Sequence, residues 1–168
     1  MVEQRVRKLL SGNLNGNPLL YGIEEFVSPH VELVTEEASG GKFIPDEVIV
    51  GLSKLECEIK IPGVTRSILN SYGASMKGNI ELDVKSSEED AEGSKFAIAE
   101  ALTGKIVSIK DETVKMGSKP MVTIKMALVA YKKTEDGAIV YDIKTKTQNI
   151  NLGDGDIMEE HRRNVGLP

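Results

Sequence analysis

The chain has 168 residues, of which 40% are hydrophobic, and its 21 basic and 26 acidic side chains give a net charge of −5. This length fits one domain with its own hydrophobic core, and the negative charge argues against tight DNA or RNA binding, which uses positive side chains to neutralise phosphates. A single Cys57 excludes an intramolecular disulfide and a zinc site built from cysteines.

The first third of the chain has little regular periodicity. Residues 1–20 contain many Gly and Asn, which favour turns, and are predicted to form an irregular N-terminal segment. Residues 23–34 alternate apolar and polar positions on either side of Pro29, which indicates two short strands or one interrupted strand. Residues 35–48 contain paired glycines and many polar side chains, and we interpret them as a long polar loop.

Two strands with strict alternation flank a short helix. Residues 53–61 and 79–85 place apolar side chains on one face and charged side chains on the other, which predicts one buried and one wetted face. Between them, Thr65 is expected to cap a two-turn helix that ends at Gly73. The acidic residues 86–93 are interpreted as a solvated loop. The predicted buried positions are Leu55, Cys57, Ile59, Ile61, Ile80, Leu82 and Val84.

Three further strands are predicted in the second half of the chain. Residues 96–109, 122–132 and 138–146 have Val, Ile, Thr and Tyr at the spacing of strands. The last two are expected to form a hairpin, because Asp136 and Gly137 suit a tight turn between strands.

A second helix is predicted near the C-terminal end. Asp156 is expected to cap it, with Glu159 in the capping-box position, and Gly166 is expected to stop it. The chain therefore reads as mostly strands with one or two short helices and no long crossover helices. This pattern predicts a mainly β fold, an antiparallel sandwich or barrel, in a single domain over residues 1–168.

Motifs for chemistry are weak. His30 and His161 have no serine, cysteine or carboxylate at the spacing of a nucleophile and its base. Residues 38–42, ASGGK, lack the spacer and the final Ser or Thr of a phosphate loop, and residues 153–156, GDGD, lack the ligand spacing of an EF-hand. Acids two residues apart on the strands lie in mixed Lys/Glu rows, which are typical of a wetted sheet surface. We expect no catalytic residue, no metal and no cofactor.

Targeting and membrane segments are not expected either. The first ten residues carry charges at positions 3, 5, 7 and 8, which interrupt the apolar run that a signal peptide needs. No other stretch has the length and apolarity of a membrane span. We expect a soluble protein that is made in the cytoplasm and does not insert into membranes.

Two long stretches have the layout of a known family. Near the N-terminus, "GNLNGNPLLYGIEEFVSPHVELVTEEASGGKFIPDEVIVGLSKLECEIKI" contains an Asn/Gly turn, a strand running into a proline, a polar loop with paired glycines, and "GLSKLE" entering an amphipathic strand. Near the C-terminus, "MALVAYKKTEDGAIVYDIKTKTQNINLGDGDIMEEHRRNVGL" contains a tyrosine-bearing strand, a "DG" turn, a "YDI" strand, an Asn/Gly/Asp loop and a terminal "R-x-x-x-GL" helix. In order and spacing together, these features resemble the major tail tube proteins of contractile phage tails and phage-tail-like bacteriocins.

The resemblance implies a structural function. Members of the family form six-membered rings whose sheets join into a continuous barrel around a lumen, and the rings stack into a tube that the sheath drives outward. The implied partners are other copies of the chain, the tail sheath protein, the baseplate proteins that initiate the tube and the tape measure protein, with non-specific passage of DNA. The implied location is a virion tail or a tail-like particle, with synthesis in the cytoplasm of the bacterial host.

Two sets of residues are candidates for this assembly. Long loops in compact domains usually have a function, so residues 35–48 are expected to reach the next ring. The charged strand faces are expected to line the lumen, where an acidic wall would repel DNA phosphates. The ring-stacking candidates are Ala38, Ser39, Gly40, Gly41 and Lys42, and the lumen candidates are Lys54, Glu56, Glu58, Lys60, Glu81 and Asp83.

Other functions stay open at this point. The tube protein of a bacterial secretion system would share the implied architecture and differ in its partners. A monomeric β-barrel that binds a small ligand would instead enclose an apolar cavity. An enzyme is the third alternative, and the lack of a catalytic constellation argues against it.

Overall fold

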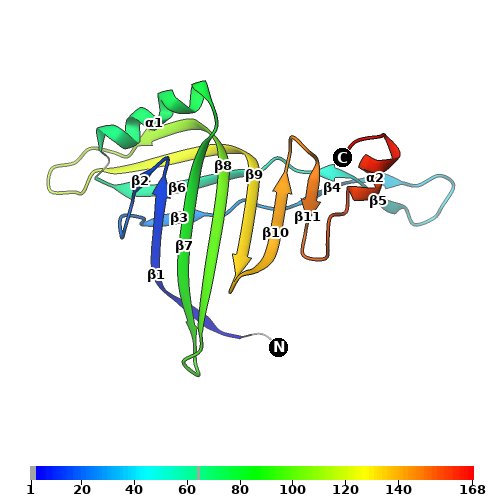
Figure 1. Ribbon diagram of the computed structural model, residues 1–168, viewed down its shortest axis with the longest axis horizontal. Coiled ribbons are helices and arrows are strands. Elements are labelled where there is room, and N and C mark those ends of the chain that lie inside the picture. The colour runs from blue at the N-terminus through cyan, green and yellow to red at the C-terminus, as the bar shows by residue number, and fades with distance from the viewer. Residues whose placement is uncertain (1–2, 64) are drawn as a thin grey trace.

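The computed structural model describes residues 3–63 and 65–168. Within them the chain forms mostly β-strands, with one helix in the middle of the chain and a shorter one near its C-terminal end (Figure 1). The strands are β1 (Arg5–Leu14), β2 (Asn17–Pro18), β3 (Glu25–Val27), β4 (Leu33–Ala38), β5 (Asp46–Leu52), β6 (Glu56–Pro62), β7 (Ile80–Asp90), β8 (Lys95–Asp111), β9 (Met121–Glu135), β10 (Ala138–Lys144) and β11 (Asn149–Asn151), and the helices are α1 (Arg66–Lys77) and α2 (Glu159–Asn164).

One antiparallel sheet contains most of these strands. Among the described residues it has nine strands in the order β11-β10-β9-β8-β7-β1-β2, with β6 also paired to β9 and β3 to β6. β4 and β5 form a separate two-stranded sheet. The order has end strands, so the large sheet is open within one subunit. The prediction of a mainly β, antiparallel fold with two short helices is confirmed.

The long strands β8 and β9 change neighbours along their length. β9 pairs with β6 through residues 121–127 and with β10 through residues 130–135, and Figure 1 shows it curving from one direction into the other. The register between β8 and β9 shifts between Thr103 and Gly104. A Cβ on Gly104 would lie 2.1 Å from the carbonyl oxygen of Ala127, a distance that no side chain can occupy. Glycine therefore permits the close backbone approach at the bend.

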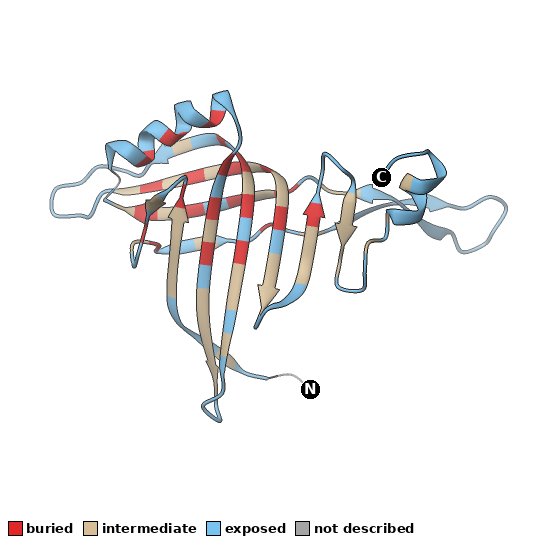
Figure 2. Ribbon diagram, viewed as in Figure 1, coloured by how far each residue is buried: buried red, intermediate tan, exposed pale blue. Residues whose placement is uncertain are grey.

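The hydrophobic core lies along one face of the large sheet. In Figure 2 the buried positions form bands across β6, β7, β8 and β9. The alternation predicted for β6 and β7 is confirmed, because each of their predicted core side chains is buried. Burying one such side chain contributes about 1.5–3 kcal/mol. The most deeply buried large side chains are Tyr131, Leu14, Ile59, Leu82, Leu102, Ile106, Ile124, Met126 and Ile143.

The irregular segment predicted for residues 1–20 is wrong for residues 5–14, and the solvated loop predicted for residues 86–93 is wrong for residues 86–90. Residues 1 and 2 lie outside the described part of the chain. Residues 5–14 form β1, and the acidic residues 86–90 belong to β7. β1 and β7 pair along their length, from Arg5 opposite Asp90 to Leu14 opposite Leu82. The register sets Arg5 opposite Asp90 and Arg7 opposite Glu88, so basic side chains neutralise the acidic run. Few side chains on β1 are buried, and the strand therefore lacks the apolar alternation that would mark it in the sequence.

The long polar loop predicted for residues 35–48 is wrong as well. Most of it lies in a β-hairpin, here called the arm, which consists of β4, β5 and the turn between them. Every residue of β4 is exposed, and so is every residue of β5 before Leu52. Figure 1 shows the arm extending away from the large sheet. Its turn is tight, because Lys42 N donates to Ser39 O across two glycines with positive φ.

The helix ends differ in part from the predictions. α1 continues through Gly73 to Lys77, and Thr65 precedes it without a side-chain capping bond. Met158 occupies the N-cap position of α2, so the predicted Asp156 cap and its capping box are wrong. The stop at Gly166 is confirmed.

Two tight backbone turns match the sequence prediction. The amides of Gly166 and Leu167 donate to the carbonyls of Arg163 and Arg162, with Gly166 at φ 77°, which is a Schellman ending of α2. The predicted hairpin turn between β9 and β10 is confirmed as a primed turn, because Asp136 and Gly137 have φ of 50° and 84°.

The bend at Gly104 gives the first prediction. Gly104→Ala should lower the free energy of unfolding of the unassembled subunit by about 3 kcal/mol, because the new methyl group forces the backbones of β8 and β9 apart. Gly73→Ala, inside α1 with open space around it, is the control and should raise stability by about 0.5–1 kcal/mol. Denaturant unfolding followed by circular dichroism measures both. Equal stability of the Gly104→Ala variant and the wild type would contradict the proposed role of this contact.

Candidate assembly surfaces

The predicted lumen residues lie on the face of the sheet that is opposite the core. On β6, Glu56, Glu58 and Lys60 alternate with buried side chains, and Lys54 is exposed just before the strand. On β7, Glu81 and Asp83 do the same. The pairing of β6 with β9, β9 with β8 and β8 with β7 places both sets of side chains on one face of the sheet.

The two charged rows share that face without touching. Glu81 is opposite Thr103 of β8, and Glu56 is opposite Ala127 of β9, which is opposite Lys105 of β8. Thr103 and Lys105 are two residues apart on β8 and flank buried Gly104, so both point away from the core. Strands β8 and β9 therefore separate the row on β6 from the row on β7.

Ion pairs partly neutralise the charges on β6. Glu56 accepts from Lys54 at 3.1 Å and from Lys125 at 3.4 Å. These lysines, Lys54 foremost, lower the pKa of the Glu56 carboxyl. Lys60 pairs with Glu112 at 2.7 Å, and this contact raises the pKa of Lys60. The face on β6 thus carries mixed charge, whereas Glu81 and Asp83 add two acids on β7.

Small side chains occupy the middle of the same face. Ala97, Ala99, Ala101 and Thr103 alternate along β8 with larger side chains that point toward the core. Beside the charged row on β7, these residues form a strip of short side chains on the wetted face.

The predicted ring-stacking residues lie at the tip of the arm. Ala38 is the last residue of β4, and residues 39–42 form the tight turn, after which Lys42 pairs with Asp46. Directly beyond the turn, Phe43 is fully exposed and Ile44 is 75% exposed. Sequence reasoning missed these two side chains, although an aromatic and an aliphatic residue inside a polar stretch were a visible signal.

A polar link around buried Glu100 attaches the segment before the arm to the large sheet. Tyr131 Oη donates to Glu100 Oε1 at 2.6 Å, and Ser28 Oγ donates to Glu100 Oε2 at 3.2 Å. Glu100 is 7% exposed, and burial, together with the carboxylate of Glu100, raises the pKa of Tyr131. Ser28 precedes Pro29 on the way to β4, so the link holds the segment that leads into the arm. The members of this link lie far apart in the chain, so no local sequence pattern indicates the contact.

A second link attaches α2 to β11. Asp156 accepts from the amides of Ile150 and Met158, each at 3.0 Å, and pairs with Arg162 at 2.7 Å. The Arg162 guanidinium, with these two amides, holds the pKa of Asp156 at about 2. Asp156 is therefore an anchor between strand and helix instead of a helix cap.

Other groups singled out in the sequence have ordinary surroundings. His30 is exposed and lies 3.3 Å from Glu32, and His161 is exposed on α2. Among residues 3–63 and 65–168, no group of three or more His, Cys, Asp or Glu side chains is placed to hold a metal ion. In the same part of the chain, the helices are too short or too polar to cross a membrane.

An open sheet with free edges, a projecting arm and a wetted charged face define a subunit whose surfaces are suited to assembly. The sequence matches the family of phage tail tube protein FII over residues 9–166, and the chain belongs to this family. It is thus a structural tube protein, and the resemblance noted from the sequence is confirmed.

Solved structures show the same fold. A chain from the sheath–tube complex of PVC, an extracellular contractile injection system, in its extended state has a TM-score of 0.57 at 7% identity, covering 75% of this chain and 88% of that chain. A chain from the PVC sheath/tube terminator, also in the extended state, has a TM-score of 0.57 at 6% identity, covering 75% and 93%. At these identities the likeness concerns the fold alone. No curated protein sequence matches the chain significantly.

Proposed function

We propose that six copies of this subunit close into a ring and that the rings stack into the inner tube of a contractile tail, in a phage or a phage-tail-like particle. The observation that carries this proposal, beside the family match, is the free edge of β1. β2 pairs with Asn13 and Leu14 of β1, and Leu19 N donates to Gly12 O, so among the described strands the edge from residue 5 to residue 11 has no partner. Unpaired edges attract further strands, and a closed ring of identical copies pairs all of them.

The charged face supports the position of the lumen. The other face of these strands packs in the core, so the charged side chains of the lumen candidates must face water. In a closed ring, water is present on the outer surface and in the bore. The outside of a contractile tube contacts a sheath, and we therefore assign this face to the bore. Six copies at −5 give a net charge of 6 × −5 = −30 per ring, which disfavours adhesion of DNA.

The partners follow from this role. The tube would contact copies of itself, the tail sheath protein, baseplate proteins that start the tube and a tape measure protein inside it. The structural likeness to a chain of a sheath–tube complex supports the sheath as a partner. The subunit would function in a virion tail or a tail-like particle after its synthesis in the host cytoplasm, with no catalytic step of its own.

The arm supplies the contact between rings in this proposal. It is a two-stranded hairpin, which is marginally stable alone, and all of it except Leu52 is exposed. Its tip, residues 38–42, would reach the next ring and fix the stacking.

Assembly tests the proposal directly. The purified protein should form rings of about 110 kDa, since 6 × 18.3 kDa is 109.8 kDa, or longer tubes, because ring closure pairs the free edges. Size-exclusion chromatography with light scattering and negative-stain electron microscopy measure this. A stable 18.3 kDa monomer at high concentration, even with baseplate components as seeds, would contradict it and favour the monomeric ligand-binding barrel.

Shortening the arm tests the stacking role. Deletion of residues 38–42 should leave a folded subunit that still forms rings but no longer stacks, because the tip no longer spans the gap between rings. Circular dichroism checks the fold, and electron microscopy separates rings from tubes. Ser39→Ala, which keeps the length of the arm, is the control and should stack normally. Tubes of normal length from the deletion variant would refute the stacking role.

Charge reversal tests the lumen. The combined substitutions Glu56→Lys, Glu58→Lys, Glu81→Lys and Asp83→Lys should leave the ring intact, because substitutions of solvent-facing side chains change the free energy of unfolding little. The altered bore should hold DNA in a salt-dependent way, since lysines displace counterions from phosphates. Retention of labelled single-stranded DNA by purified tubes measures this effect.

The lumen test has its control on other surfaces of the subunit. Reversal of four exposed acids in turns or in α2 should not change DNA retention: Glu92, Asp154, Glu159 and Glu160. Side chains of the lumen candidates found against the sheath or between subunits in a density map of the tube would refute the assignment.

A further inference from the structure

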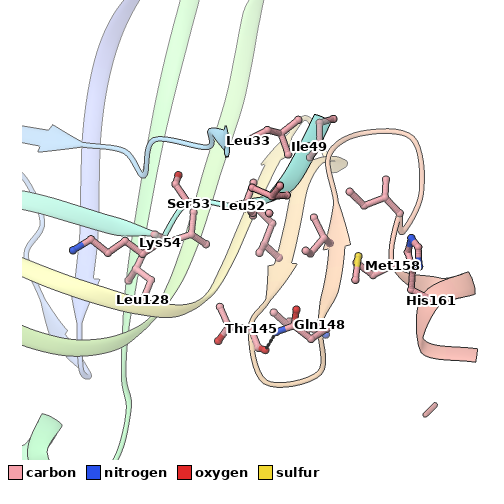
Figure 3. Close-up of a pocket in the computed structure, with 17 residues that line it drawn as sticks. Leu33, Ile49, Leu52, Ser53, Lys54, Leu128, Thr145, Gln148, Met158 and His161 are labelled. Atoms are coloured by element: carbon pink, nitrogen blue, oxygen red, sulfur yellow. Dashed lines mark hydrogen bonds between the residues drawn. The ribbon is translucent and has the colours of Figure 1, made fainter. Parts of the chain in front are cut away.

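A deep groove opens where the arm leaves the large sheet (Figure 3). It has a volume of about 730 Å³, and three parts of the chain line it: the base of the arm, strands β9 to β11, and the segment that leads into α2. Figure 3 shows Leu33, Ile49 and Leu52 from the arm on one side, with Met158 and His161 on the other. The link from Asp156 to Arg162 fixes the α2 wall, so the groove is built on anchored elements.

The groove presents large apolar side chains to water. Ile49 is 60% exposed, Ile157 is 52% exposed and Leu33 is 39% exposed. An apolar concavity of this kind on a surface marks a binding site. Its charged lining is basic: Lys54, Lys144 and His161 lie along it, and among the described residues no carboxylate does.

The tip of the arm has the complementary properties. Phe43 and Ile44 project with almost no cover, and an aromatic side chain can bury 150–250 Å² in a pocket. Residues 32–47 carry five carboxylates against one lysine, so the arm is acidic. An acidic hairpin with an apolar tip fits a groove with an apolar floor and basic rim.

The tip cannot fill the groove of its own subunit. Ile44 lies five residues before Ile49, which lines the groove, and a strand of that length spans roughly 17 Å. The ladder between β4 and β5 keeps the arm extended, and Figure 1 shows its tip pointing away from the large sheet. The occupant must come from another molecule.

We propose that Phe43 and Ile44 of one subunit insert into the groove of a second copy of this chain. The inference rests on the proposed stacking role of the arm and names the surface that receives it. Tip and groove are different surfaces, so the contact is head-to-tail and leaves one free tip and one free groove after each addition. Such contacts build rings or open polymers, as a tube requires.

Substitutions on both surfaces test this contact. Phe43→Ser at the tip and Ile157→Glu in the groove should each raise the protein concentration needed for tube formation at least tenfold, because each removes a central apolar contact. Val114→Ser, at a 93% exposed apolar residue in the loop between β8 and β9, is the matched control and should assemble as the wild type does. Ile157→Ala serves as a milder groove variant if the glutamate disturbs folding, which circular dichroism checks.

Cross-linking identifies the pair of surfaces. Subunits with Lys42→Cys and differently tagged subunits with His161→Cys should form a mixed disulfide when they assemble together under mild oxidation. Cys57 will not interfere, because it is buried and burial raises the pKa of its thiol to about 12. Lys42→Cys mixed with Lys119→Cys, in the loop between β8 and β9, is the control and should not cross-link.

The outcomes separate this inference from the proposed function. Wild-type protein that forms no rings or tubes would overturn both. Tubes that need residues 38–42 but tolerate Ile157→Glu and show no mixed disulfide with His161→Cys would overturn the groove alone. Mixed disulfides together with tenfold weaker assembly of both variants would establish the groove as the receptor for the arm.

Discussion

The close approach of two backbones at Gly104 is the constraint on which the rest of the structure depends. There β8 and β9 bend together, and β9 passes from pairing with β6 to pairing with β10. The bend joins two groups of strands into one sheet with one continuous core. It also places β10, β11 and α2 beside the base of the arm, and thereby creates the groove. A side chain at this position would meet the Ala127 carbonyl.

The subunit is well packed on one face of the large sheet, whereas other surfaces are exposed and lack a packing partner within the described part of the subunit. Its core side chains fill the space behind the large sheet, and its buried polar groups have partners, as the link among Ser28, Glu100 and Tyr131 shows. In contrast, the edge of β1, the whole arm and the apolar groove lack cover. This division fits the proposed assembly, in which the uncovered surfaces gain their partners in the polymer.

Charge has a different role in each part of the molecule. Between β1 and β7 it pairs two strands, since Arg5 and Arg7 face Asp90 and Glu88, and Arg5 also lies 3.5 Å above the ring of Phe96. Near α2 it anchors a helix through Asp156. On the open face of the sheet it serves hydration, where exposed ion pairs add little stability. The same composition, slightly acidic overall, thus supports folding at some sites and solubility at others.

The sequence by itself determined the features that depend on neighbours along the chain. The strict alternation in β6 and β7, the turn at Asp136 and the end of α2 at Gly166 were predictable, because one buried face or one positive φ leaves a local signature. Only the tertiary structure decided the rest. β1 and the arm are strands with little buried surface, so they lack apolar alternation. β1 in addition pairs with β7, which is distant in the sequence. The groove and the Glu100 link join segments that are distant in sequence, and no local pattern encodes such contacts.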